Sequence, residues 1–190
     1  MIRTFIAIDL PSPVQAVLER FERELRKADA AVAWIRPDRI HLTLKFLGNI
    51  APERIPALRE ALESVSRTIS PFRLQAAGCG AFPTIRQMRV IWVGLRGDAD
   101  RLGDLKRKIE EATVPLGFES EDRPFKPHLT LGRVKGRGRL SVLQEILMAN
   151  QSFEAEAFDV VEVVLYKSDL KPDGAQYTPL FRAPFTGRPE

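Results

Sequence analysis

Apolar positions along the chain follow two alternating periods, one typical of strands and one typical of helices. Residues 3–8 form a short apolar run, and residues 14–27 place Val14, Leu18 and Leu25 at helical spacing. The same pattern continues through the first half of the chain. It predicts a strand, a helix and a second strand at residues 40–46, 55–65 and 72–76.

The order of these elements recurs in the second half of the chain. The corresponding segments there are 90–95, 101–114, 125–131, 140–147 and 158–166. A shift of 87 positions superimposes the two series, which indicates an internal duplication. We therefore expect a single α+β domain over residues 1–190, with copies of one motif at 41–44 and 128–131. It should be bilobal, with two pseudo-symmetric lobes that each carry an antiparallel-rich sheet, helices on the outside and a cleft between them.

The only two histidines of the chain open these motif copies, and both copies read His-Leu-Thr-Leu. They are 87 positions apart, in register with the duplication. Strict alternation on a strand places His41, Thr43 and Lys45 on one face, and it places the leucines and Phe46 on the other. The apolar face would anchor the strand, and the polar face would be free for chemistry.

The second copy predicts the same arrangement. Lys126, His128 and Thr130 share one face, and the leucines share the other. Arg133 would lie with the leucines by strict alternation, but Gly132 allows a local bend. Arg133 is therefore an ambiguous candidate for contact with an anion.

Two facing rows of this kind would carry two imidazoles and two hydroxyls across a cleft. Imidazole can hold or lose a proton near neutral pH. Hydrolysis of a phosphate ester needs both a base and an acid, and hydroxyls can donate to non-bridging phosphate oxygens. The pattern predicts acid–base chemistry on a phosphodiester. A single copy would be read as ordinary sheet surface, and two histidines without clustered cysteines or carboxylates make a poor zinc site.

The paired motif resembles the signature of the two-histidine phosphoesterase superfamily. Flanking segments are similar to its RNA 2',3'-cyclic phosphodiesterase branch, also called 2'-5' RNA ligases. These segments are Phe5–Pro11, His41–Gly48, Arg89–Gly94, Lys126–Arg133 and Tyr166–Tyr177.

The resemblance implies an enzyme that opens an RNA 2',3'-cyclic phosphate to a 2'-phosphomonoester without metal or other cofactor. It implies that His41 is the proton donor to the departing 3'-oxygen, that His128 is the proton acceptor from water, and that Thr43 and Thr130 hold the phosphate. Some members also join RNA ends through a reversible 2'-5' linkage. The sequence symmetry alone leaves the two histidines interchangeable.

Further contacts with RNA are expected from cations and aromatic rings near the motifs. The proposed substrate-binding residues are Lys45, Lys126, Arg133, Arg89 and Phe82, with Arg86, Trp34 and the basic run 135–139 as further candidates. The basic run is equally well explained as a solvated loop. Two rival functions stay open: a phosphodiesterase for a small cyclic nucleotide or ADP-ribose cyclic phosphate, and a non-catalytic module that binds RNA ends.

Composition narrows the setting. The chain has a formal net charge of +4, which favours an anionic partner such as RNA, with tRNA fragments as one candidate. Cys79 is the only cysteine, so no internal disulfide can form. It lies between two glycines and is not expected to act as a nucleophile. No apolar run reaches the length of a membrane span. We expect a cytoplasmic monomer without a membrane segment.

Overall fold

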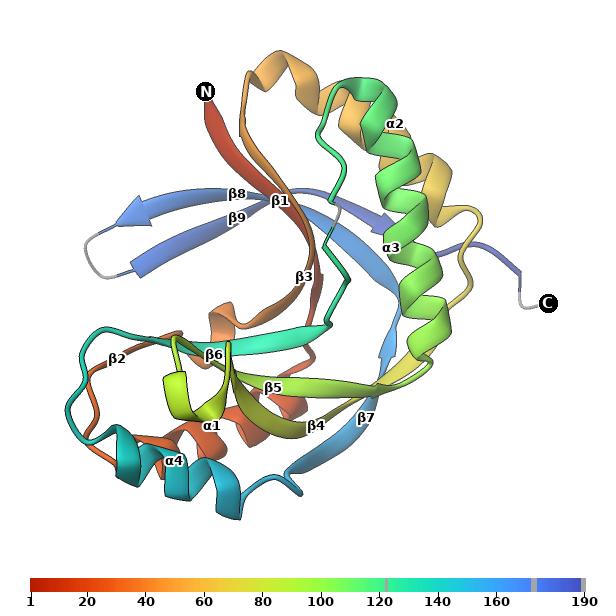
Figure 1. Ribbon diagram of the computed structural model, residues 1–190. Coiled ribbons are helices and arrows are strands. Elements are labelled where there is room, and N and C mark those ends of the chain that lie inside the picture. The colour runs from red at the N-terminus through yellow and green to blue at the C-terminus, as the bar shows by residue number, and fades with distance from the viewer. Residues whose placement is uncertain (122, 172–173, 189–190) are drawn as a thin grey trace.

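One antiparallel sheet runs through the whole molecule (Figure 1). The computed structural model describes residues 1–121, 123–171 and 174–188. Its strands are Ile2–Asp9 (β1), Val32–Trp34 (β2), His41–Ile50 (β3), Phe72–Phe82 (β4), Val90–Gly97 (β5), His128–Val134 (β6), Glu154–Val160 (β7), Glu162–Lys171 (β8) and Gly174–Pro184 (β9). Its α-helices are Ser12–Arg26 (α1), Ile55–Ser66 (α2), Ala99–Thr113 (α3) and Leu140–Ala149 (α4). The strand order is β7-β4-β5-β6-β3-β1-β8-β9, with β2 on β6.

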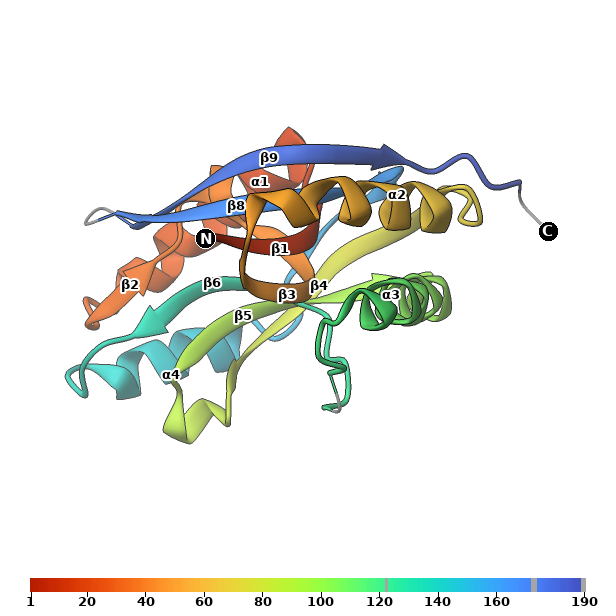
Figure 2. The ribbon, with the colours of Figure 1, turned by 90° about the horizontal axis from the view of Figure 1, so that it is seen from above.

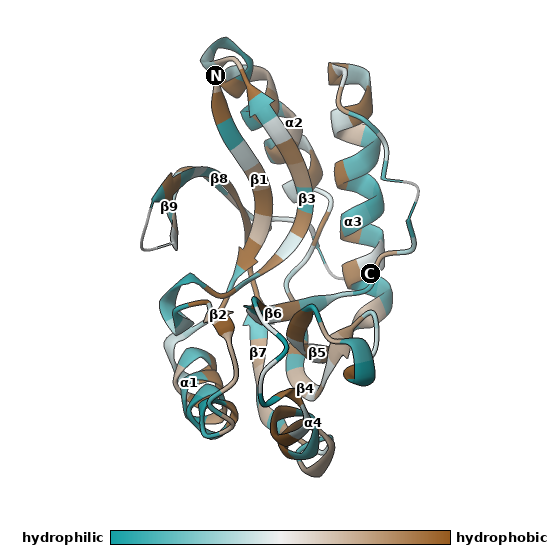
Figure 3. Ribbon diagram, turned by 60° about the vertical axis from the view of Figure 1, so that its left-hand side comes forward, coloured by the Kyte–Doolittle hydropathy of each residue, from teal (hydrophilic) through white to brown (hydrophobic). Residues whose placement is uncertain are grey.

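The helices form where apolar residues recur every three or four positions, and they bury that face against the sheet. In α1 the buried side chains include Val14, Leu18 and Leu25. Pro13 in the first turn fits a helix start, and Arg26 in the last turn suits the negative end of the helix dipole. Figure 3 shows hydrophilic and hydrophobic residues alternating along α1 and α3, as expected for helices that face solvent on one side.

The two lobes each contain elements from both halves of the chain. The first lobe consists of β1, β3, β8 and β9 with α2 and α3, and the second consists of β2, β4, β5, β6 and β7 with α1 and α4 (Figures 1 and 3). Figure 2 shows β8 and β9 side by side above β1. A shift of 87 positions places α1 on α3, and it brings β4 to β8. The duplicated halves have therefore exchanged a helix and a strand, because α1 and β4 come from the first half but pack in the second lobe.

The lobes meet where the two motif strands meet. In the part of the chain that the structure describes, β3 and β6 pair through Leu42 and Leu129. Both leucines are buried in the shared core, as are Leu44 and Leu131. The leucines of the motifs thus anchor both strands, as the alternation predicts, and they set the histidines that precede them at the junction.

The predicted α+β class with two pseudo-symmetric lobes is confirmed. The details differ at the strands of the second half. The single strand predicted at 158–166 is two strands that break at Val161, and the sequence analysis did not predict β2 or β9. Both of these strands owe their place to distant partners, β6 and β8 respectively.

Candidate functional site

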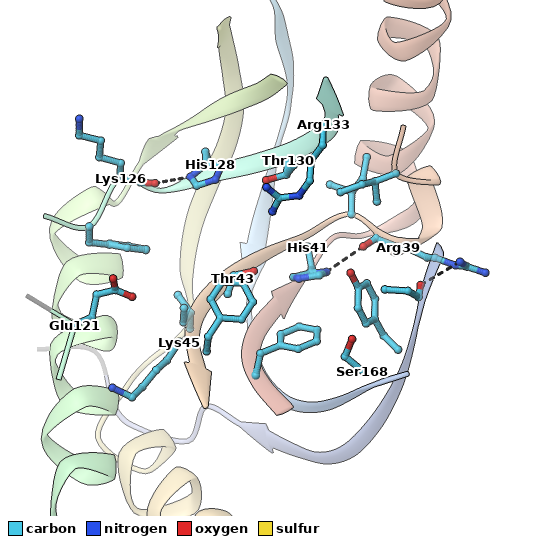
Figure 4. A pocket seen from close by; sticks show the side chains of 18 of the residues that line it. Arg39, His41, Thr43, Lys45, Glu121, Lys126, His128, Thr130, Arg133 and Ser168 are labelled. Atoms are coloured by element: carbon cyan, nitrogen blue, oxygen red, sulfur yellow. Dashed lines mark hydrogen bonds between the residues drawn. The ribbon is translucent and has the colours of Figure 1, made fainter. Parts of the chain in front are cut away.

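A cavity of about 790 Å³ lies between the lobes, and both motifs open into it. His41 and Thr43 line it from β3, while His128 and Thr130 line it from β6 (Figure 4). All four side chains are half-buried, so they are held by the fold and remain accessible from the cavity. The structure therefore brings the four motif residues predicted from the sequence into one site.

Each histidine is anchored by the backbone of its own strand. The Nδ1 atom of His41 lies 3.0 Å from the carbonyl oxygen of Arg39, and that of His128 lies 2.7 Å from the carbonyl oxygen of Lys126. A carbonyl only accepts, so Nδ1 carries the hydrogen and donates it in both cases. Nε2 is consequently the atom left for chemistry in both rings. It is an acceptor in the neutral ring and a donor in the protonated ring.

The surroundings of the two imidazoles differ. His41 stacks on Phe5 with ring centroids 4.7 Å apart, and it meets Tyr177 edge-on at 5.0 Å. Burial lowers the pKa of His41 below the ordinary 6.5, although the Arg39 carbonyl and the Asp9 carboxylate act in the opposite direction. His128 instead meets one ring edge-on, that of Phe82, at 5.0 Å. Burial therefore favours the neutral form of the His41 ring.

A β-bulge in β3 changes the face on which the predicted polar row continues. The pairing of β1 with β3 passes from Thr43 to Lys45, so Leu44 is an extra residue. At the bulge two residues of β3 oppose one residue of β1, and the side chains of β3 beyond it change faces. Lys45 is buried, whereas Phe46 is 58% exposed and lines the cavity. The expectation that Lys45 continues the His41–Thr43 row and that Phe46 faces the core is therefore wrong.

A matching bulge in β6 resolves the ambiguity at Arg133. The pairing of β5 with β6 passes over Leu131, and both Leu131 and Gly132 are buried. Arg133 then lies on the face of Thr130 and lines the cavity (Figure 4). Because the bulge follows the same motif position in both copies, Arg133 in β6 corresponds to Phe46 in β3.

Lys45 is among the residues that line the cavity, but it is almost wholly buried and its ammonium contacts protein groups. Its ammonium forms a buried ion pair with Glu110 of α3 and donates to the carbonyl of Glu119 at 2.8 Å. Lys106 pairs with the same carboxylate. Burial acts to raise the pKa of Glu110, but the hydrogen bonds from Lys106 and Lys45 lower it overall. Lys45 thus ties β3 to α3 and to the segment that leads to the second motif.

The remaining predicted contact residues divide into two groups. Lys126 and Phe82 line the cavity, as Arg133 does. Arg89 is exposed just before β5 and does not line the cavity, so its predicted place in the cleft is wrong. Several further candidates from the sequence also lie outside the cavity lining: Arg86, Trp34 and residues 135–139.

Several residues that line the cavity were not predicted from the sequence: Arg3, Phe5, Arg39, Phe46, Ser168 and Tyr177. Arg39 had a usable signal, because it precedes its histidine by two positions just as Lys126 does. Tyr177 had no local signal, because its strand β9 is placed by pairing with β8.

Two other chemistries have no support from the geometry. The Cys79 thiol is buried and donates to the carbonyls of Leu147 and Asn150 at 3.4 and 3.2 Å, and burial raises its pKa to about 11. Within residues 1–121, 123–171 and 174–188, no group of three or more His, Cys, Asp or Glu side chains is arranged to hold a metal. No helix in those ranges is long and apolar enough to cross a membrane.

Comparison with known families matches the two halves of the chain separately. The family model described as LigT like Phosphoesterase matches twice, at residues 8–92 and 93–177. Each match contains one motif and its histidine. The duplication seen in the element order is thus also present at the level of the family model.

Known proteins resemble the chain over nearly its full length. It is 34% identical over 177 residues to an RNA 2',3'-cyclic phosphodiesterase of Methanothermobacter thermautotrophicus, covering 93% of this chain and 95% of that protein. Among solved structures, the protein TT0787 of Thermus thermophilus has a TM-score of 0.81 at 27% identity, covering 97% of this chain and 98% of that one. E. coli LigT complexed with 3'-AMP has a TM-score of 0.76 at 27% identity, with the same coverage.

Proposed function

The chain belongs to the LigT-like phosphoesterase family, and from that premise we propose that it hydrolyses RNA 2',3'-cyclic phosphate ends to 2'-phosphomonoesters by paired-histidine catalysis without metal. One observation carries the proposal. Two imidazoles with their Nδ1 atoms anchored to the backbone, and two threonines beside them, line one cavity from facing lobes. Relatives named RNA 2',3'-cyclic phosphodiesterases support the choice of substrate.

In the proposed reaction the cyclic phosphate lies between the two Nε2 atoms. His128 accepts a proton from water as the water oxygen bonds to phosphorus. His41 donates its proton to the 3'-oxygen as the bond from phosphorus to that oxygen breaks. The products are a free 3'-hydroxyl and a 2'-phosphate, and the two histidines exchange protonation states. Thr43 and Thr130 would donate to the non-bridging oxygens, where charge develops.

The acid role of His41 depends on the substrate. Burial favours its neutral form in the free protein. A phosphate anion beside the ring favours the imidazolium, because opposite charges within a few ångströms stabilise each other. Substrate binding would therefore raise the pKa of His41, so that the ring takes up from solvent the proton that the reaction requires.

The test is incubation of the purified protein, in EDTA, with a short RNA that ends in a 2',3'-cyclic phosphate, followed by phosphorus NMR of the product. A 2'-phosphate is expected, and variants His41→Ala and His128→Ala should each lose about 10²- to 10⁴-fold in rate while their circular dichroism is unchanged. A 3'-phosphate product, an EDTA-sensitive reaction or wild-type rates in either variant would contradict the proposal.

The reverse reaction follows from the same groups. A 5'-hydroxyl of a second RNA in the place of water would give a 2'-5' linkage. For RNA as the partner, the cationic lining of the cavity gives support, since lysines and arginines outnumber Glu121 among the residues that form it. A tRNA fragment as substrate and a monomeric state stay predictions.

A further inference from the structure

Three arginines from separate parts of the chain line the cavity together with one tyrosine. Arg3 comes from β1, Arg39 from the turn before β3, and Arg133 from β6, and all three line the cavity with Tyr177 of β9. Burial raises the pKa of the Tyr177 hydroxyl, while the positive charges of Arg3, Arg133 and Arg39 act to lower it. The three positive charges and the Tyr177 hydroxyl thus belong to one cavity.

The proposed acid–base chemistry does not use these cations. None of them forms an ion pair with a carboxylate within residues 1–121, 123–171 and 174–188. Arg39 donates one hydrogen bond, to the carbonyl of Ala175 at 3.1 Å. Glu121, the one carboxylate among the described residues of the cavity lining, pairs with Arg123 at 2.7 Å. Neighbouring like charges without a counter-charge repel, so the group is suited to an anion.

The arginine group lies beside the reacting groups and on one side of them. The ring of Tyr177 meets that of His41 at 5.0 Å, so the hydroxyl region is one ring away from the imidazole. Arg133 in β6 and Phe46 in β3 occupy equivalent positions of the two motif copies. The two strands are therefore similar in backbone but differ in charge at this position. A nucleotide whose reacting phosphate lies between the histidines would therefore meet Arg133 on the β6 side and the ring of Phe46 on the β3 side.

We propose that Arg3, Arg39 and Arg133 form a second anion site, which binds the phosphate on the 5'-oxygen of the nucleoside that carries the reacting phosphate. The proposal rests on the proposed function, because it takes the reacting phosphate to lie between the histidines. In an RNA the second phosphate is the phosphodiester to the preceding nucleotide, and in a free nucleotide it is a 5'-phosphate. Guanidinium groups suit either one, since their planar array of donors matches phosphate oxygens.

Equilibrium binding tests the site independently of turnover. Isothermal titration calorimetry compares adenosine 2'-monophosphate with adenosine 2',5'-bisphosphate, which differ only in the 5'-phosphate. The bisphosphate should bind the wild-type protein at least tenfold more tightly, about 1.4 kcal/mol. Arg3→Gln should remove most of that difference and leave the affinity for the monophosphate within about twofold. Arg133→Gln should also remove most of the difference between the two ligands. Arg20→Gln, on the exposed face of α1 and outside the cavity lining, removes the same charge and should keep the full difference.

Kinetics distinguish the two sources of the second phosphate. The substrates are adenosine 2',3'-cyclic phosphate, its 5'-phosphorylated form, a dinucleotide ending in the cyclic phosphate, and that dinucleotide with a neutral methylphosphonate linkage. We expect a lower KM for the second and third substrates than for the first, and no such gain for the fourth. A gain with the 5'-phosphate alone would assign the site to free nucleotides, and a gain with the dinucleotide as well would assign it to RNA.

Equal affinity of the wild-type protein for the two adenosine phosphates would overturn the second site. So would a preference that survives in both Arg3→Gln and Arg133→Gln. A wild-type protein that hydrolyses none of the four substrates contradicts the proposed function instead, and the calorimetric comparison still decides whether the arginine site binds a second phosphate.

Discussion

At the scale of single residues, the two histidines share one anchor and differ in environment. Both donate from Nδ1 to the carbonyl two positions earlier, so their tautomers are fixed by the main chain. The surroundings of the two rings differ because the His41 ring contacts Phe5 of β1 and Tyr177 of β9. The two motifs are identical in sequence, so the difference between the environments of His41 and His128 comes from residues of other strands.

This asymmetry predicts different pH profiles for the two kinetic parameters. A general acid must be protonated, so activity falls as pH rises through its pKa. For kcat/KM, which reports the free enzyme, the fall assigned to His41 should lie below its ordinary pKa of 6.5. For kcat, which reports the complex, the phosphate favours the imidazolium and the fall should move to higher pH.

The measurement is a pair of profiles between pH 5 and pH 9 with the cyclic phosphate substrate at constant ionic strength. The acidic and alkaline falls of each profile belong to the coupled pair of histidines. The quantity to compare is therefore the pH of half-maximal activity on the alkaline side, for kcat and for kcat/KM. An alkaline midpoint of kcat at or below that of kcat/KM would rule out His41 as the acid.

The hydroxyl of Thr130 offers a second test on this scale. Thr130→Val keeps the shape of the side chain and removes the donor, so kcat should fall by about 100-fold. Thr130→Ser keeps the donor and serves as the matched control, with most of the rate retained. If Val and Ser at this position lower the rate equally, the methyl group matters and the hydroxyl does not stabilise the phosphate.

At the scale of elements, Lys45 joins β3 to α3 and to the segment before the second motif. Lys45→Met removes the buried ammonium and leaves Glu110 with Lys106 alone. The free energy of unfolding should fall by about 1–3 kcal/mol, because a half-buried carboxylate loses the better-buried of its two partners. Denaturation in urea measures this change, and kinetics on the same protein should show a lower kcat as the two motifs lose their fixed separation.

Lys45→Arg is the control for this prediction, since it keeps the charge and a donor for the Glu119 carbonyl. It should recover most of the stability and the rate. A Lys45→Met protein as stable as the wild type would show that the ion pair contributes nothing to the junction.

The same elements show what can be read from the sequence. Their order and the motif faces up to Thr43 and Thr130 follow from periodicity, which is local. The two bulges are not local, because they depend on how β1 and β5 pair with the motif strands. Strict alternation therefore misplaces Lys45 and Phe46 and leaves Arg133 ambiguous, and the pairing that brings β9 and Tyr177 to the site has no signature in the local sequence.

At the scale of the whole molecule, the exchange of elements makes each lobe depend on both halves of the chain. Fragments 1–87 and 88–190 each hold one complete motif, yet the first lobe takes β8, β9 and α3 from the second half. Neither fragment alone can bury its apolar strands, so each should be largely unfolded, and mixing them should restore the fold. Amide NMR spectra of the separate and mixed fragments check this; a dispersed spectrum from one fragment alone would contradict it.

The pairing of Leu42 with Leu129 also has a mechanical meaning. Each of these residues directly follows a motif histidine, so the proposed acid and base lie at the point about which one lobe would turn against the other. When one lobe turns about this point, atoms close to it move least and atoms far from it move most. Flexing of one lobe against the other would widen or narrow the mouth of the cavity while it left the separation of the two imidazoles almost unchanged. An RNA end, as the proposed function requires, could thus be admitted and released while the two imidazoles keep their separation.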